Sequence, residues 1–237
     1  MRSFFNGILI IISTLIIAPI CTLGALVPVY GERLFFFWAR LWCLVITAGC
    51  GVKVRGELPP PGTIDWNKPH VFMSNHQSHY DVPCITRVVP SYIRFLTKKE
   101  LSHIPIFGWA LRAAGFVFID RNRRTDAFRS IENAAADLVK KDHSIVVFPE
   151  GTRSPDGRLQ SFKKGGFHLA IMANAVIVPI GVTGTIHVLS KKSSGVKPGN
   201  VVVRVGTPIL ASTYGKERIN ELMADVHSAV EKLVCQK

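Results

Sequence analysis

Residues 3–31 carry no charged side chain and are rich in Ile, Leu, Val and Ala. A helix of about 20 such residues is long enough to cross the hydrocarbon core of a bilayer, which is roughly 30 Å thick. A second uncharged stretch, residues 41–51, is too short to span, so it indicates an interfacial or re-entrant helix. Trp38 and Trp42 suit the level of the lipid headgroups. The sequence therefore predicts a membrane anchor over residues 1–56, formed as a membrane hairpin or as one span followed by a surface helix.

A cleaved signal peptide is the alternative for residues 1–25, because one Arg precedes the apolar run. The run is longer than the apolar region of about 7–15 residues that signal peptides have. No convincing small-x-small cleavage site precedes the second uncharged stretch. We therefore expect the segment to be retained as an anchor.

The formal net charge of +13 indicates an anionic partner. Nucleic acid and an anionic membrane surface both attract a basic chain. No recognition helix, zinc finger or RNA-binding motif accompanies the scattered Lys and Arg residues, so we expect the membrane surface and no nucleic acid. Because Lys and Arg follow the anchor, the rest of the chain is predicted to face the cytoplasm from an inner or plasma membrane.

The sequence after the break at residues 59–62 alternates short β-branched runs with helical patterns. Apolar residues recur at helical spacing over residues 125–141, with Thr125 as the expected N-cap, and again over residues 219–234. Such alternation predicts an α/β domain over residues 57–237, with a mixed, largely parallel sheet flanked by helices. The expected strands lie at residues 71–74, 93–97, 116–119, 144–148, 176–180 and 201–205.

The five cysteines show no pairing pattern, and no Cys-x-x-Cys motif is present. Neither a disulfide framework nor a zinc site is expected, which fits a reducing compartment. The sequence also contains no Gly-x-x-x-x-Gly-Lys-Ser/Thr motif, so it is not that of a P-loop kinase. We predict a protein that works without a metal ion or bound cofactor.

His76 and Asp81 lie in the run NHQSHYD, residues 75–81, directly after an apolar stretch that is typical of a strand. A histidine is the side chain best suited to accept a proton near neutral pH, and a carboxylate can fix its tautomer and stabilise its cation. Five residues subtend about 500° of helix, so the two side chains cannot share a face of a regular helix. They converge only if the segment is a turn that enters a helix, which is where α/β proteins place their chemistry.

A structural alternative fits the same residues. Ser78-x-x-Asp81 matches a helix capping box, in which the carboxylate accepts a hydrogen bond from the backbone amide of Ser78. The spacing alone does not separate the capping and catalytic interpretations. His79 is a rival base, but we expect it to be a partly solvated residue of the first helical turn.

Polar residues follow other expected strands as well. Gly151 allows close backbone approach, Thr152 offers a hydroxyl, and Arg153 presents a bidentate fork that suits phosphate oxygens. An internal ion pair between Glu150 and Arg153, and a plain surface position for Arg121, are the structural alternatives. The segments concerned are FPEGTRS at residues 148–154, GFVFIDR at residues 115–121 and VPI at residues 178–180.

Together with NHQSHYD, these segments resemble in order the four motif blocks of the 1-acylglycerol-3-phosphate acyltransferase family, within the wider glycerolipid acyltransferase superfamily. The resemblance covers about residues 53–210, and no motif position departs from the family pattern. Four ordered blocks are far more specific than a lone His-x-x-x-x-Asp. The connecting sequence is also similar, notably KKEL at residues 98–101, IPIFGW at residues 104–109 and FKKG at residues 162–165.

The resemblance implies that His76 removes the proton from the sn-2 hydroxyl of 1-acylglycerol 3-phosphate while Asp81 orients the imidazole and balances its charge. The hydroxyl oxygen then attacks a fatty acyl thioester of CoA or acyl-carrier protein, and phosphatidate is formed. Backbone amides near Asn75 or Gln77 are expected to bind the developing oxyanion. No Gly-x-Ser-x-Gly elbow is present, so no serine acyl-enzyme is expected.

The resemblance also implies residues that bind the acceptor. Arg153 is expected to hold the phosphate, with Glu150, Gly151 and Thr152 shaping its loop, Arg121 assisting, and Lys98 and Lys99 as further candidates. The nearest alternatives are the same transfer to glycerol 3-phosphate, lyso-ornithine lipid or another lysophospholipid. A non-catalytic binder of anionic lipid is a third interpretation, but it leaves His76 and Asp81 without a role.

Overall fold

The computed structural model describes residues 2–119, 124–141, 143–193 and 195–236. The strands of its central sheet are β1 (Val52–Glu57), β2 (His70–Ser74), β3 (Ile93–Lys98), β4 (Val117–Ile119), β5 (Ser144–Val147), β6 (Val176–Thr183), β7 (Gly199–Val205) and β8 (Ile209–Leu210). Their order across the sheet is β1-β7-β6-β2-β5-β3-β4, and β8 pairs with β6 at one end.

Most neighbouring strands run parallel. β2 pairs in parallel with β5 and β6, β3 with β4 and β5, and β1 with β7. Only the pairs that β6 makes with β7 and β8 are antiparallel among the strands described. The predicted α/β fold with a mixed, largely parallel sheet is confirmed. Because parallel strands end at one edge of a sheet, the segments that follow β2, β3, β4, β5 and β6 meet there.

The six predicted strands are all present, with small differences at their ends. β1 and β8 were not predicted. β1 pairs with β7 along its whole length, from Val52 beside Gly199 to Glu57 beside Arg204. The predicted end of the anchor at residue 56 therefore falls inside a strand of the main sheet.

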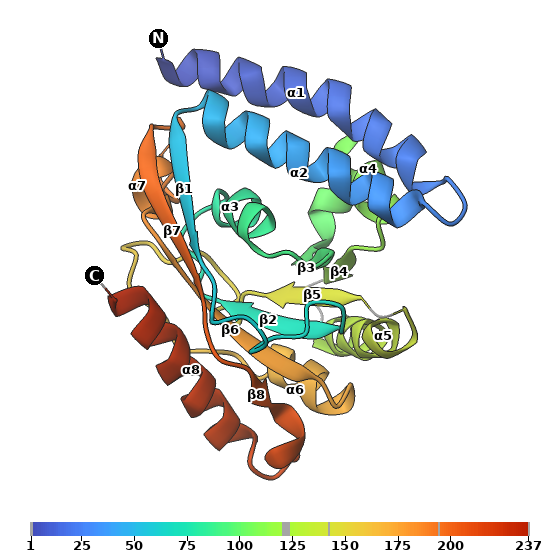
Figure 1. Cartoon of the computed structure of the whole chain (residues 1–237), viewed down its shortest axis with the longest axis vertical. Helices are drawn as coiled ribbons and strands as arrows, with labels where there is room; N and C mark the ends of the chain where they lie inside the picture. Colours follow the sequence, from blue (N-terminus) through green and yellow to red (C-terminus); the bar gives the residue numbers. More distant parts are fainter. Residues whose placement is uncertain (1, 120–123, 142, 194, 237) are drawn as a thin grey trace.

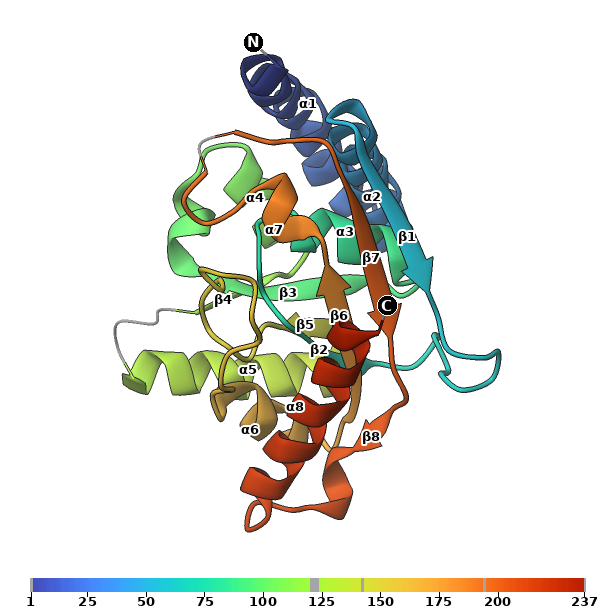
Figure 2. The same ribbon diagram turned by 90° about the vertical axis from the view of Figure 1, so that its left-hand side faces the viewer.

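Helices cover both faces of the sheet (Figures 1 and 2). α5, α6 and α8 lie on one face, while α1–α4 lie on the other. β2 is buried from both sides, because Val71 and Met73 pack into the core under α5, α6 and α8, and Phe72 packs with Ile85 of α3. The helices are α1 (Arg2–Ala25), α2 (Gly31–Gly49), α3 (Asp81–Val88), α4 (Phe107–Ala113), α5 (Arg124–Lys141), α6 (Gly165–Met172), α7 (Thr185–Val188) and α8 (Ile219–Cys235).

The two long predicted helices correspond to α5 and α8. α5 begins at Arg124, so the expected N-cap Thr125 lies inside the helix. On α8, the apolar stripe that the sequence shows is buried at Leu222, Val226 and Val230. The periodicity therefore located both helices. It placed the start of α5 one residue too late, which is within the usual uncertainty of helix ends.

The second helix of the anchor region differs from the prediction of a short helix at residues 41–51. α2 begins well before that stretch and includes Glu32 and Arg40. Oε1 of Glu32 lies 2.6 Å from Nη2 of Arg94 in β3, and the Arg40 guanidinium donates to the carbonyls of residues 89–91. Both charges are satisfied by the α/β domain, and the helix includes them.

α1 is the one helix in the described part of the chain that is long and apolar enough, by length and composition, to cross a membrane. One face of α1 packs on α2 and α4, and Nε1 of Trp42 donates to Oγ1 of Thr14 at 3.1 Å. The other face leaves large apolar side chains exposed, at Phe4, Phe5, Ile11, Ile12, Leu15, Ile16 and Leu23. α1 thus has an inner face that belongs to the core and an outer face that is apolar.

Glu32→Ala should lower the free energy of unfolding by roughly 2 kcal/mol, because the Arg94 guanidinium would lose its carboxylate partner in a buried position. The Arg94 side chain is only 4% exposed, against 42% for Glu32. Glu221→Ala is the matched control, since it breaks an Arg218 contact of the same 2.6 Å in which both side chains are more than half exposed. That loss should stay below about 1 kcal/mol. Urea denaturation in detergent measures both, and equal losses would contradict a stabilising role for the Glu32–Arg94 pair.

Candidate active site

His76 lies in the turn between β2 and α3, and three hydrogen bonds hold it. Its Nδ1 is 2.8 Å from Oδ2 of Asp81, and its backbone amide donates to Oε1 of Glu150 at 2.8 Å. Its carbonyl accepts the backbone amide of Ser154 at 2.7 Å. The structure thus brings together the predicted His–Asp pair, and the loop of residues 148–154 meets that pair at the histidine.

Asp81 is completely buried, and its carboxylate is fully engaged. Oδ2 also accepts the backbone amides of Gln77 at 2.7 Å and Ser78 at 2.9 Å, while Oδ1 accepts the hydroxyl of Thr185 at 2.5 Å. A buried carboxylate requires such donors, and hydrogen bonds to a charged acceptor are strong. The contact with the Ser78 amide is the one that the capping interpretation predicted. The helix itself begins at Asp81, with Tyr80 and not Ser78 as its N-cap, so the carboxylate holds the turn that leads into α3 and also faces His76.

The contacts of His76 assign its tautomer. Because the Asp81 carboxylate accepts a hydrogen bond, Nδ1 carries the hydrogen and Nε2 keeps its lone pair. Phe148 stacks on the imidazole with 4.0 Å between ring centroids and an interplanar angle of 14°. The side chain of His76 is 16% exposed. An imidazole that is oriented in this way and open at one edge can act as a general base through Nε2.

Glu150 was predicted among the residues that bind substrate. In the structure its carboxylate accepts a hydrogen bond from the backbone amide of His76. The residue is 2% exposed, so a ligand at the surface does not reach its carboxylate. Burial raises the pKa of Glu150 to about 7, and hydrogen bonds from the backbone amides of His76 and Gln160 oppose that rise. Any effect of Glu150 on a reaction would therefore act through the position of His76.

The rest of the Glu150–Arg153 loop lies at the surface. Gly151 has a φ of +74°, in the left-handed region that favours glycine, and an added Cβ would meet the side chain of Lys163 at 3.0 Å. The ammonium of Lys191 is 3.3 Å from Oγ1 of Thr152 and 3.4 Å from the carbonyl of Arg153. The predicted loop residues thus share their surface with two lysines.

The positive charge of Arg153 acts on His79. The pKa of His79 is lowered, first by partial burial and then by the positive charge of Arg153 and by His76. His79 lies in the turn just before α3 and is exposed, close to the predicted position. Arg153 and His76 are therefore both close enough to His79 to affect its charge, and the next residue, Ser154, is hydrogen-bonded to the backbone of His76.

Three other residues were predicted to assist in binding the phosphate, and the structure describes two of them. Lys98 ends β3 at the same edge of the sheet, and its Nζ is 2.8 Å from Oε1 of Glu100. Lys99 follows at the start of a short 3-10 helix, Lys99–His103. Arg121 lies outside the described residues. A role for these three cations in binding stays a prediction.

Three further residues position the site and were not predicted to do so. The side chain of Asn75 hydrogen-bonds both backbone groups of Val182 in β6, at 2.8 and 2.7 Å. Nε2 of Gln77 donates to the carbonyl of Gly157 at 2.9 Å, and Thr185 donates to the buried carboxylate described above. Asn75 and Gln77 are polar residues directly after a buried strand, which is a usable signal. Thr185 is 104 residues from its partner, and its local sequence gives no such signal.

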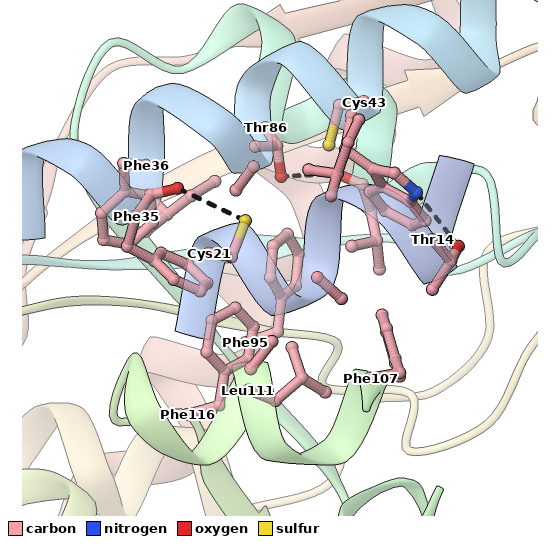
Figure 3. Close-up of a pocket in the computed structure, with 17 residues that line it drawn as sticks. Thr14, Cys21, Phe35, Phe36, Cys43, Thr86, Phe95, Phe107, Leu111 and Phe116 are labelled. Carbon is pink, nitrogen blue, oxygen red and sulfur yellow. Dashed lines mark hydrogen bonds between the residues drawn. The ribbon is translucent and has the colours of Figure 1, made fainter. Parts of the chain in front are cut away.

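An apolar cavity adjoins the site between α1, α2, α3 and α4 (Figure 3). It contains about 620 Å³ of space, including the part open to solvent. Cys21 of α1 and Phe35 and Phe36 of α2 form one wall, facing residues of α4 and β3 across the cavity. Phe95 lines the cavity and stacks on Phe148 with 6.0 Å between centroids. Because Phe148 in turn stacks on the imidazole of the site, two aromatic rings lie between the cavity and the base.

Within the ranges that the structure describes, no group of three His, Cys, Asp or Glu side chains could hold a metal ion. The five cysteines are free, and Cys235 is the exposed one, while Cys21, Cys43, Cys50 and Cys84 are buried.

Comparison with known proteins relates the whole chain to one group of enzymes. Residues 51–183 match the acyltransferase family. The chain is similar to 1-acyl-sn-glycerol-3-phosphate acyltransferases of Escherichia coli, with 34% identity over 78% of this chain and 74% of that protein, and of Saccharomyces cerevisiae, with 32% identity over 83% and 65%. It spans about half of a coconut (Cocos nucifera) relative of the same name. The crystal structure of the 1-acyl-sn-glycerophosphate (LPA) acyltransferase PlsC from Thermotoga maritima is similar in fold, with a TM-score of 0.78 and 25% identity over 100% of this chain and 99% of that one.

Glu150→Gln should flatten the dependence of stability on pH between about 4.5 and 7. The folded state holds the pKa of this carboxyl near 7, above its ordinary value of 4.5, so the folded protein binds more protons in that window. Wild-type stability should therefore fall as the pH rises through the window and level off above it, by roughly 3 kcal/mol in total. Urea denaturation at several pH values measures this. Glu132→Gln, at an exposed position of α5, is the control, and a wild-type curve parallel to that of Glu150→Gln would contradict the raised pKa.

Proposed function

The chain belongs to the acyltransferase family, and on this premise we propose that it transfers a fatty acyl group from a thioester donor to the sn-2 hydroxyl of 1-acylglycerol 3-phosphate, forming phosphatidate. The observation that carries the proposal is the fixed imidazole of His76, with Nδ1 on Asp81 and the cationic Arg153 loop beside it. Acylation of a lysophosphatidate requires a base for the hydroxyl and a cation for the phosphate, and this arrangement supplies both. The names of the relatives support the same acceptor.

The proposed reaction runs through His76 alone as the proton carrier. Nε2 takes the proton from the sn-2 hydroxyl as its oxygen attacks the thioester carbonyl carbon, and a C–O bond forms. The tetrahedral intermediate collapses, the C–S bond breaks, and the imidazolium returns its proton to the leaving thiolate. Asp81 stabilises the imidazolium between these steps, since its carboxylate faces Nδ1.

A serine acyl-enzyme has no support at this site. Oγ of Ser78 donates to the carbonyl of Leu189 at 2.7 Å, and Oγ of Ser154 donates to Oδ1 of Asp156 at 3.0 Å. Neither hydroxyl is paired with the imidazole, which is the arrangement that activates a serine nucleophile. Direct attack by the acceptor hydroxyl therefore suits the geometry better.

One of the two expected donors for the oxyanion is already engaged. The backbone amide of Gln77 donates to the Asp81 carboxylate at 2.7 Å. The amides of His76 and Ser78 are engaged as well, with Glu150 and Asp81 respectively. These three amides fix the turn, and the amide near Asn75 stays the proposed donor to the oxyanion.

The apolar cavity between the α1–α2 hairpin and the α/β domain is the proposed site for an acyl chain. Its lining is almost entirely hydrocarbon and aromatic, and a fatty chain gains roughly 0.8 kcal/mol for each CH₂ that it buries. Phe95 at the wall of the cavity and Phe148 beside the imidazole are in contact, so the cavity lies close to the base. The thioester donor in this proposal is a fatty acyl derivative of CoA or of acyl-carrier protein.

We propose that the α1–α2 hairpin holds the protein at a membrane and that residues from β1 onward form the acyltransferase domain on the cytoplasmic side. The exposed apolar face of α1 supports the membrane contact, and the net charge of +13 supports attraction to an anionic leaflet. Both the acceptor and the product are lipids, so a site beside the bilayer keeps their chains out of water.

His76→Ala should lower turnover by about 10²–10⁴-fold while the melting temperature changes little, because general-base catalysis is lost and the backbone contacts remain. Asp81→Asn should also lower turnover, and His79→Ala should have a mild effect. The assay supplies lysophosphatidate with a palmitoyl thioester of either carrier and identifies the lipid formed. A His76→Ala variant with normal turnover would refute the mechanism, and a wild type that prefers glycerol 3-phosphate or lyso-ornithine lipid would change the acceptor.

Cys235 offers a test of the cytoplasmic orientation. It is the exposed cysteine near the end of α8, so a membrane-impermeant maleimide should label it in inverted vesicles and leave it unlabelled in intact cells. Cys235→Ser should abolish the labelling, which controls for the four buried cysteines. Strong labelling in intact cells would place the domain on the other side of the membrane.

A further inference from the structure

Lys191 lies against the Glu150–Arg153 loop but belongs to none of the four motif blocks. We propose that Lys191 binds the phosphate of the acceptor beside Arg153, as a second cation that favours a phosphate monoester. The inference rests on the proposed function and names a residue that determines its specificity. Lys191 is exposed, and its ammonium is 3.3 Å from Oγ1 of Thr152 and 3.4 Å from the carbonyl of Arg153. Two such long contacts leave at least one N–H of the ammonium available to a ligand.

The cations gathered at this loop are not neutralised by carboxylates. Among the residues that the structure describes, Arg153, Lys163 and Lys191 have no carboxylate within ion-pair distance. Five other surface cations do form such pairs, in Arg55–Glu57, Lys68–Asp65, Lys98–Glu100, Arg158–Asp156 and Arg218–Glu221. Like charges gathered around one short loop repel each other unless an anion joins them. The loop therefore has the electrostatics of a site for an anionic group.

The number of cations at this loop indicates how much negative charge its ligand carries. A phosphate monoester carries about −1.5 to −2 at pH 7, whereas a diester carries a single negative charge. The Arg153 fork can bind two phosphate oxygens, and the compact ammonium of Lys191 can approach a third. Lys163 lies against Gly151 and adds to the same positive field. The arrangement thus suits the terminal phosphate of a lysophosphatidate better than a diester headgroup.

The segment that carries Lys191 is fixed to the turn that carries the base. The carbonyl of Leu189 accepts the hydroxyl of Ser78 at 2.7 Å, and Thr185, earlier in the same segment, donates to Asp81. The hydroxyl to be acylated and the phosphate are separated by a short glycerol backbone, so the base and the phosphate cations need a constant separation. These two hydrogen bonds provide it.

Lys191→Gln should raise the Michaelis constant for lysophosphatidate by about tenfold, which corresponds to loss of one charge-assisted contact. The turnover number, the constant for the acyl thioester and the melting temperature should stay within about twofold or a few degrees of wild type. Lys191→Arg should restore much of the loss. Lys192→Gln is the matched control, since it removes the same charge one residue away at an exposed position with no contact to the loop. Its constants should be close to those of wild type.

Three results would overturn the inference while leaving the proposed function intact. In the first, the constant for the thioester rises instead, which would assign Lys191 to the donor. In the second, Lys192→Gln has an equal effect, so only the general charge of the surface matters. In the third, turnover and melting temperature fall while the lysophosphatidate constant is unchanged, so Lys191 only supports the loop. A wild type that does not acylate lysophosphatidate would remove the proposed function and the inference together.

Discussion

The buried carboxylate of Asp81 joins three segments of the chain at one point, and the geometry of the site depends on it. Its oxygens accept hydrogen bonds from the imidazole of His76, from the backbone amides of residues 77 and 78, and from the hydroxyl of Thr185. An ionised carboxylate that is buried without donors is strongly destabilised. The turn after β2, the start of α3 and the segment after β6 must therefore all be in place before this group is satisfied. Assembly of the site is in this way coupled to completion of the sheet.

Local sequence located the His76–Asp81 pair, because a five-residue spacing after a strand can converge only in a turn that enters a helix. It could not show that the capping and catalytic interpretations describe the same carboxylate, since each looks at one contact of the group. It also counted Glu150 among the residues that bind substrate, although the residue is 2% exposed and holds the backbone of His76. Burial of that kind follows from packing between β2 and β5, which spacing does not reveal. Thr185 was missed for the same reason.

In the anchor region, too, contacts between residues far apart in the sequence could not be predicted from local sequence. The sequence predicted a second helix only where residues are uncharged, at 41–51, but α2 begins at Gly31 and its Glu32 pairs with Arg94, 62 residues away. β1 was missed although its residues VKVRGE alternate between apolar and polar, as a half-exposed strand does; the run is short, and a glycine is unfavourable inside a strand. It gains its place from pairing with β7 at the edge of the sheet. β2, β5 and β6, by contrast, are mostly apolar runs buried on both faces, and all three were predicted.

The apolar cavity has walls from the hairpin as well as from the α/β domain, so the proposed membrane anchor and the proposed acyl site are parts of one structure. On the proposed function, the acceptor enters the site without leaving the bilayer. Its effective concentration is then its mole fraction among the lipids around the protein, whereas the thioester is met at its concentration in solution. The two substrates therefore respond differently to dilution by lipid. Adding inert lipid at a constant total amount of acceptor lowers the fraction of sites that the acceptor occupies. The fraction that the donor occupies stays unchanged.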